Sequence, residues 1–130
     1  MIVVDSSAVI AILLEEPDHA SIIRILARQT NAVMAAPNVL EVLMVLTGRD
    51  IEKAAEALDC LLSDHRITVT AWSDDLVPGA HAAFIRYGKG RHPAGLNFGD
   101  CMAYALAKRL DAPLLFKGND FSQTDVRVAG

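Results

Sequence analysis

The sequence is poor in cysteine and in aromatic residues, with 2 cysteines and 5% Phe, Trp and Tyr in 130 residues. Cys60 and Cys101 form no C-x-x-C pair and lack the spacing of zinc ligands, so nothing indicates a zinc module. We expect both to be small buried residues in a reducing compartment.

Long apolar runs and an excess of basic charge are also missing. No segment approaches the roughly 18 to 20 apolar residues that a membrane helix needs, and Asp5 interrupts the apolar start of the chain. No Lys or Arg precedes Arg24, so a secretory signal is not indicated and we expect a cytoplasmic protein without membrane contact. The net charge of -4 excludes a generic basic nucleic-acid coat. Binding to nucleic acid would need a local basic patch or a metal ion.

The length and pattern of the chain predict one α/β domain over residues 1–130. Hydrophobic residues make up 52% of the chain, which excludes disorder, and the length suits a single core. Short apolar strands alternate with helices, so we expect a central parallel sheet of four to five strands with helices on both faces. The strands are expected at 2–4, 32–35, 67–70 and 114–116, with a further edge strand at 126–128. The helices are expected at 8–14, 17–29, 38–46, 51–64, 73–87 and 98–110.

Four acidic residues fall at positions where such a sheet gathers its chemistry. Asp5 and Asp120 each follow a predicted strand, and Glu41 and Asp100 each lie in the first turn of a predicted helix. The carboxyl ends of parallel strands lie at one edge of the sheet, so the four side chains are expected to converge there. Carboxylates this close repel one another, and hard oxygen ligands favour Mg²⁺ or Mn²⁺. The pattern therefore predicts metal-dependent hydrolysis of a phosphodiester.

Each acid also has an ordinary structural interpretation. Asp5 could stabilise the N-terminus of the following helix through the helix dipole, although Ser6 or Ser7 could equally cap that helix. Asn38 and Glu41 have capping-box spacing, as do Asn97 and Asp100, and Asp120 lies in a segment typical of turns. Phe98 and Met102 suggest that the Asp100 end of its helix packs into the core.

One basic stretch stands out, between residues 86 and 93. Arg86, Lys89 and Arg91 lie in a glycine-containing segment that leads to the Asp100 helix, so we expect them to grip phosphates, with Tyr87 available for base stacking. A solvated loop is the alternative. Two roles fit Lys117 equally well, a contact with a phosphate and an ion pair with a nearby acid.

The chain resembles the PIN-domain ribonucleases, specifically the VapC-type toxins of type II toxin–antitoxin systems. Met1-Ile2-Val3-Val4-Asp5-Ser6-Ser7-Ala8 is similar to the first-acid motif of that family. Asn38-Val39-Leu40-Glu41 is similar to the second, and Leu96-Asn97-Phe98-Gly99-Asp100-Cys101 to the third. Leu114-Leu115-Phe116-Lys117-Gly118-Asn119-Asp120-Phe121 resembles the closing segment. The likeness covers essentially the whole chain.

The resemblance implies a Mg²⁺- or Mn²⁺-dependent endoribonuclease in which metal-activated water hydrolyses RNA. It implies Asp5 and Asp100 as the principal metal ligands, with Glu41 assisting. Ser7 is the small hydroxyl residue near the first acid, and we expect it to contact the substrate. Many relatives carry an acid where this chain has Gly118, so Asp120 is left as a supporting ligand or a turn residue. The resemblance also implies a homodimer that a cognate antitoxin protein neutralises.

Two other functions remain open from the sequence. One is a catalytically silent RNA- or protein-binding module on the same fold. The other is a phosphoacceptor signalling domain, which should carry a pair of acids after the first strand and an acid after a central strand. Here Ser6 follows Asp5, and the strand at 67–70 ends without an acid, which disfavours the signalling domain.

Overall fold

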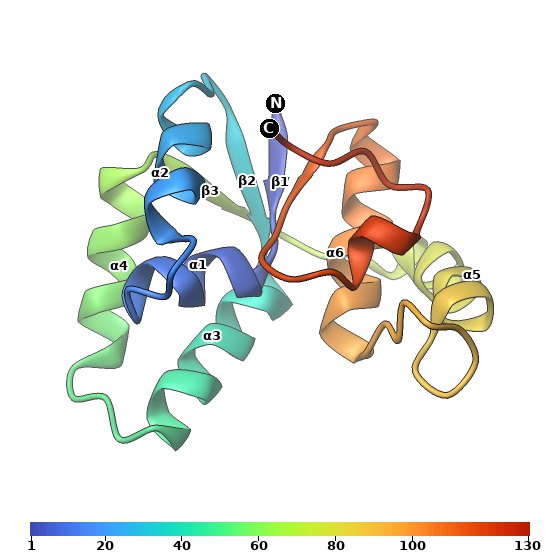
Figure 1. Ribbon diagram of the computed structural model, residues 1–130, viewed down its shortest axis with the longest axis horizontal. Helices are drawn as coiled ribbons and strands as arrows, with labels where there is room; N and C mark the ends of the chain where they lie inside the picture. Colours follow the sequence, from blue (N-terminus) through green and yellow to red (C-terminus); the bar gives the residue numbers. More distant parts are fainter.

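Four short apolar segments form a parallel sheet in the computed structural model, which describes residues 1–130 (Figure 1). The strands are β1 (Ile2–Val4), β2 (Ala32–Ala35), β3 (Ile67–Thr70) and β4 (Leu114–Leu115), in the order β3-β2-β1-β4. Val3 of β1 is in register with Val33 of β2 and with Leu114 of β4. The predicted parallel sheet is therefore confirmed, with four strands.

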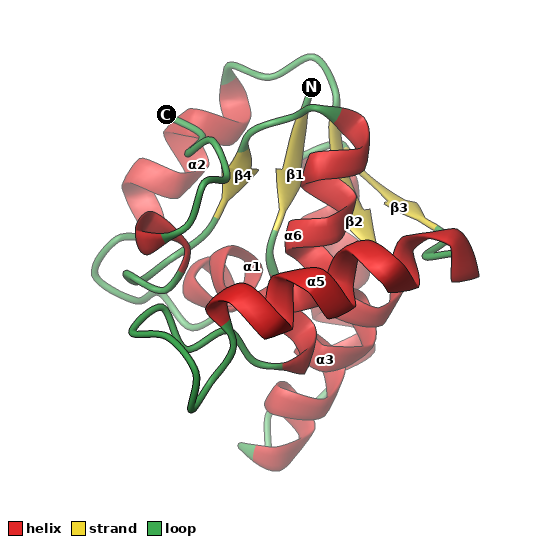
Figure 2. Ribbon diagram, turned by 90° about the vertical axis from the view of Figure 1, so that its right-hand side faces the viewer, coloured by secondary structure: helices red, strands yellow, loops and turns green.

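Helices cover both faces of this sheet, as expected. The helices are α1 (Ser6–Leu13), α2 (His19–Ala27), α3 (Ala36–Gly48), α4 (Ala54–Asp64), α5 (Val77–Tyr87) and α6 (Phe98–Leu110), with 3-10 turns at Asp74–Leu76 and Phe121–Gln123. Helices α1 to α4 lie on one side of the sheet and α5 and α6 on the other (Figure 1). In Figure 2, α5 crosses in front of α6, so that α6 lies between α5 and the sheet. No helix is long and apolar enough to span a membrane.

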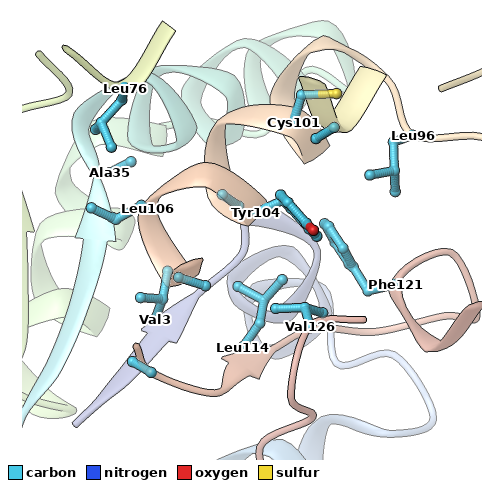
Figure 3. Close-up of a cluster of buried hydrophobic side chains, with 14 of the residues drawn as sticks. Val3, Ala35, Leu76, Leu96, Cys101, Tyr104, Leu106, Leu114, Phe121 and Val126 are labelled. Atoms are coloured by element: carbon cyan, nitrogen blue, oxygen red, sulfur yellow. The ribbon is translucent and has the colours of Figure 1, made fainter. Parts of the chain in front are cut away.

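Alternate residues of β1 enter two separate hydrophobic cores. Val3 points into the cluster under α5 and α6, where it packs with Leu106, Leu114 and other apolar side chains (Figure 3). Ile2 and Val4 belong to the cluster under α1 to α4. Because β1 is buried on both faces, its unbroken apolar sequence is the one expected of a central parallel strand.

The structure corrects several details of the sequence-based expectations. Helix α4 begins at Ala54 rather than residue 51, because Lys53 takes a left-handed conformation with φ 55° that ends the preceding turn. The expected edge strand at 126–128 is reduced to a single bridge between Leu114 and Val128. Cys101 is buried as expected, whereas Cys60 is exposed on α4.

The strand order places the site. From β1 the chain moves through β2 to β3 on one side of the sheet, and β4 then pairs with the other side of β1. Sheets of this kind bind ligands in the crevice outside the carboxyl ends of the strands, where the order reverses. Asp5 directly follows β1, and the segment from Phe116 to Asp120 follows β4, so both border this position.

Candidate active site

Asp5 lies at the carboxyl end of β1 and forms the N-cap of α1, with only 2% of its surface exposed. Its Oδ2 accepts hydrogen bonds from the backbone N–H of Ser7 at 3.0 Å and from Ser7 Oγ at 2.6 Å. Its Oδ1 is buried and has no hydrogen-bond partner. Asp5, rather than Ser6 or Ser7, therefore caps α1, and one of its oxygens remains unused by the fold.

Ser7 connects the segments that follow β1 and β4. Its hydroxyl donates to Asp5 and accepts from the backbone N–H of Lys117 at 3.0 Å. Ser7 was expected to bind substrate. In the structure its hydroxyl is engaged on both sides, which fixes Asp5 relative to the segment after β4, and its contact with substrate stays a prediction.

Glu41 projects from the second turn of α3 toward the first turns of α1 and α6. Its Oε1 accepts hydrogen bonds from Ser6 Oγ and, at 3.3 Å, from Asn38 Nδ2. Asn38 also donates to the carbonyl oxygen of Gly99 at 3.1 Å. The N-cap of α3 is Ala35, without a side-chain cap, so the capping-box interpretation of Asn38 and Glu41 is wrong. Asn38 instead donates to α6, and Glu41 accepts from α1.

Asp100 lies in the first turn of α6, where one of its carboxylate oxygens takes part in a helix cap and the other is free. Asn97 is the N-cap, and the two residues form a capping box: Asp100 N donates to Asn97 Oδ1 at 2.9 Å and Asn97 N donates to Asp100 Oδ2 at 3.1 Å. The structural interpretation of Asp100 is therefore confirmed. The capping box occupies only one of its two carboxylate oxygens, which leaves the other for a ligand.

Burial and nearby acids disfavour the charged forms of Asp5 and Asp100. The pKa of Asp5 is raised to about 7, chiefly because burial disfavours the charged form and also because Asp100 and Glu41 carry like charge. The pKa of Asp100 is raised to about 6 by burial and by the nearby Asp120 and Glu41. Like charge therefore couples Asp5 to Asp100 and Glu41, and Asp100 to Glu41 and Asp120.

Asp120 is the most peripheral of the four acids. It is exposed, follows Gly118 at the left-handed φ of 100°, and makes no side-chain cap on the 3-10 turn that it precedes. It acts on the site through its charge near Asp100. Its role as a supporting ligand or as a turn residue stays a prediction.

None of the basic residues singled out in the sequence forms an ion pair with the four acids. Lys117 Nζ lies 3.1 Å from Glu16 Oε1, so Lys117 forms the ion pair that was one of its two expected interactions. Arg86 lies over the ring of Tyr87, 4.7 Å from its centroid, and 3.6 Å from Asp125, while Arg91 donates to the carbonyl of Ile85. Lys89 is exposed.

Two aromatic residues are placed opposite to expectation. Tyr87 is buried in the core, so it is not available for base stacking. Phe98 is 78% exposed at the start of α6, and Met102 is only half-buried, because the core side of this helix is formed by Cys101, Ala103, Tyr104 and their neighbours. The sequence had indicated an accessible Tyr87 and a buried Phe98, and both expectations are wrong.

The residues present fit a hard divalent cation. No three Asp, Glu, His or Cys side chains form a ready-made ligand cluster. Mg²⁺ does not require one, because it keeps several waters and is often bound through one or two carboxylates. The unpartnered Asp5 Oδ1 and the raised pKa values of Asp5 and Asp100 are the features that a bound cation would relieve.

The chain has a parallel sheet with acidic residues beyond the carboxyl ends of β1 and β4 and on the adjoining helices. The PIN-domain family model matches residues 2–127. The chain therefore belongs to the PIN-domain family. It is 44% identical to Ribonuclease VapC36 of Mycobacterium tuberculosis over 129 residues, covering 98% of this chain and 93% of that protein. It is 43% identical to Ribonuclease VapC of Mycolicibacterium smegmatis, covering 95% of this chain and 96% of that protein.

Solved structures share the fold at lower identity. The crystal structure of Mycobacterium tuberculosis VapC20, described as a sarcin-ricin loop cleaving toxin, has a TM-score of 0.79 at 19% identity and covers 97% of this chain and 96% of its own. VapBC2 from Rickettsia felis bound to a DNA fragment from its promoter has a TM-score of 0.76 at 14% identity, covering 98% of this chain and 96% of its own. The resemblance to VapC-type PIN domains found in the sequence is confirmed.

Proposed function

We propose that this protein is a Mg²⁺-dependent endoribonuclease, the toxin of a toxin–antitoxin pair. Its relatives at 43% to 44% identity are named as VapC ribonucleases and match nearly the full length of the chain. Mn²⁺ is the alternative metal, since it prefers the same oxygen ligands. We place the protein in the cytoplasm, where its RNA substrate would be found.

The observation that carries this proposal is the buried Asp5 with an oxygen that the fold does not use. Burying a carboxylate beside two others lowers stability, and capping α1 needs only one oxygen. A catalytically silent RNA- or protein-binding module gains nothing from such a group. In a catalytic metal site the free oxygen would bind the ion.

The side chains divide the work as follows. Asp5 and Asp100 would hold the ion through their remaining oxygens, and Asp120 would add negative charge at the rim. Glu41, held by Ser6 and Asn38, would assist from the α3 side. When bound, the ion supplies an activated water and neutralises charge on the phosphoryl oxygen. Ser7 keeps Asp5 oriented by donating to Oδ2.

Cationic side chains near the site would attract the RNA backbone. Lys117 follows β4 and could exchange Glu16 for a phosphate at little cost, because partly exposed ion pairs contribute little. Lys89 and Arg91 lie on the loop that leads to α6 and would contact phosphates further along the strand. Their charge would offset the overall net charge of -4.

An exposed apolar face supports a homodimer. Phe98 is 78% exposed and Met44 65%, and both line a hollow of about 580 Å³ between α3 and α6. A second hollow of about 500 Å³ continues from Phe98 toward α5. The exposure of Met44 beside Phe98 favours a contact with another chain. We propose that a second copy covers this face and that an antitoxin protein binds the dimer. A structure of similar fold, with a TM-score of 0.70 at 15% identity, is a toxin–antitoxin complex from Klebsiella pneumoniae.

The experiment is cleavage of mixed RNA by the purified protein with Mg²⁺, with Mn²⁺ and with EDTA. Asp100→Asn should abolish cleavage, whereas Asp59→Asn, on the exposed face of α4, should cleave like the wild type. Cleavage that persists in EDTA or in Asp100→Asn would refute the proposal. Incubation with acetyl phosphate tests the signalling alternative, which requires a stable phosphoprotein.

A further inference from the structure

Tyrosines apart, three polar or charged residues of this chain are buried, and all three lie at the candidate site. They are Asp5, Ser6 and Asn38. Asp5 is a proposed metal ligand and Ser6 donates to Glu41. Asn38, which has no exposed surface, has so far been described only as a hydrogen-bond donor to Glu41 and Gly99.

Asn38 connects the two helices that carry the assisting and the principal acid. Its Nδ2 donates to Gly99 O at 3.1 Å, in the first turn of α6, and to Glu41 Oε1 at 3.3 Å. Both partners are acceptors, so the amide nitrogen must face them and the orientation of the amide is fixed. Asp100 is the residue next to Gly99, and the same side chain therefore sets Glu41 relative to Asp100.

Helix formation does not explain an asparagine at this position. Asn38 is inside α3 and caps nothing, because Ala35 is the N-cap. Its Oδ1 is buried without a partner, so the amide is only half satisfied. A half-satisfied buried amide disfavours the folded state relative to an apolar side chain of the same size.

Gly99 is the second part of this junction. A Cβ at Gly99 would lie 2.5 Å from Glu41 Oε1 and 2.6 Å from Oε2, closer than real contacts allow. The carboxylate of Glu41 therefore lies directly against the backbone of α6, in a space that only glycine leaves open. The contact is with the end of a flexible side chain, so a methyl group here would displace Glu41 and leave the helix intact.

We propose that Asn38 and Gly99 are positioning residues that hold the Glu41 carboxylate at the distance from Asp100 at which both serve one divalent cation. The amide suits this task because it donates a hydrogen bond without bringing a positive charge. A lysine or arginine in its place would neutralise the acids and compete with the cation. This inference rests on the proposed metal-dependent function.

The test measures Mn²⁺ affinity by calorimetry on the protein without RNA, alongside the kcat and KM of RNA cleavage and the melting temperature. Asn38→Leu removes the donor at similar size, and Gly99→Ala adds the methyl group. Val42→Ala is the matched control, because Val42 is fully buried one turn further along α3 and contacts the core under α1 to α4.

We expect Asn38→Leu and Gly99→Ala each to weaken Mn²⁺ binding and lower kcat by roughly 10- to 100-fold, the usual effect of losing a group that orients a metal ligand. KM for RNA should change little and the melting temperature should not fall. Val42→Ala should melt at a lower temperature with wild-type Mn²⁺ affinity.

Wild-type Mn²⁺ affinity and kcat in a folded Gly99→Ala or Asn38→Leu variant would overturn the inference while leaving the proposed function intact. If Asn38→Leu does not fold, Gly99→Ala decides, since alanine favours the helix. A wild-type protein that neither binds Mn²⁺ nor cleaves RNA would overturn the proposed function and this inference together.

Discussion

Replacing Asp5 by asparagine should make the metal-free protein more stable at neutral pH than the wild type. In the folded chain the pKa of Asp5 is about 7 against an ordinary value of 3.8. A raised carboxyl pKa means that the folded state keeps a proton that the unfolded chain has released, so stability falls as pH rises from about 4 to 7. A difference of about 3 pKa units corresponds to a loss of at most about 4 kcal/mol, complete above about pH 7.

Asparagine removes this titration and keeps the cap. It retains an oxygen for the Ser7 N–H, and asparagine is as good an N-cap as aspartate. The new amide group in place of the unpartnered Oδ1 costs about 1–3 kcal/mol at every pH. The free energy of unfolding of Asp5→Asn minus that of the wild type should therefore increase by up to about 4 kcal/mol between about pH 4 and pH 8.

The assay is urea unfolding of both proteins across this pH range in a chelator, repeated in excess Mg²⁺. The magnesium ion should restore wild-type stability above pH 7 and leave Asp5→Asn unchanged, because binding to the folded state alone stabilises it. Asp59→Asn is the control and should follow the wild type. Parallel pH profiles for wild type and Asp5→Asn in the chelator would refute the account of Asp5.

Three further outcomes follow from the same structure. Ser7→Ala removes the hydroxyl that lowers the pKa of Asp5, so the pH-dependent loss of stability in a chelator should extend to higher pH, and an unshifted profile would contradict this. Lys89→Ala should raise KM for RNA and reduce its salt dependence with kcat unchanged, and an unchanged KM would remove Lys89 from the RNA path. Phe98→Glu should yield monomers in light scattering, and a persistent dimer would exclude the Phe98 face as the interface.

Much of the fold could be predicted because its signals are local. The run Ile2-Val3-Val4 is apolar on both faces, which only a central parallel strand requires, and β1 lies in that position. The start of α4 could not be predicted, because the apolar periodicity begins at Ile51 while the left-handed Lys53 delays the helix. The exposure of Phe98 and the burial of Tyr87 depend on which side of α6 and α5 faces the sheet, which residue type alone does not determine.

The acids could be predicted, and so could the capping partner of Asp100, but the partners of Glu41 could not. Asp5 and Asp100 follow from strand ends and helix starts, which are visible along the chain. Ser6 and Glu41 lie on separate helices, as do Asn38 and Gly99, and no spacing rule reports such contacts. Asn38 had an ordinary explanation as a cap, and only its burial inside α3 removes that explanation.

The claim that remote acids share one cation is tested most directly by anomalous diffraction from crystals grown with Mn²⁺. The account predicts a single strong peak in direct contact with one oxygen of Asp5 and one of Asp100, with Glu41 beside it. A peak that touches neither Asp5 nor Asp100, or no peak at saturating Mn²⁺, would contradict it.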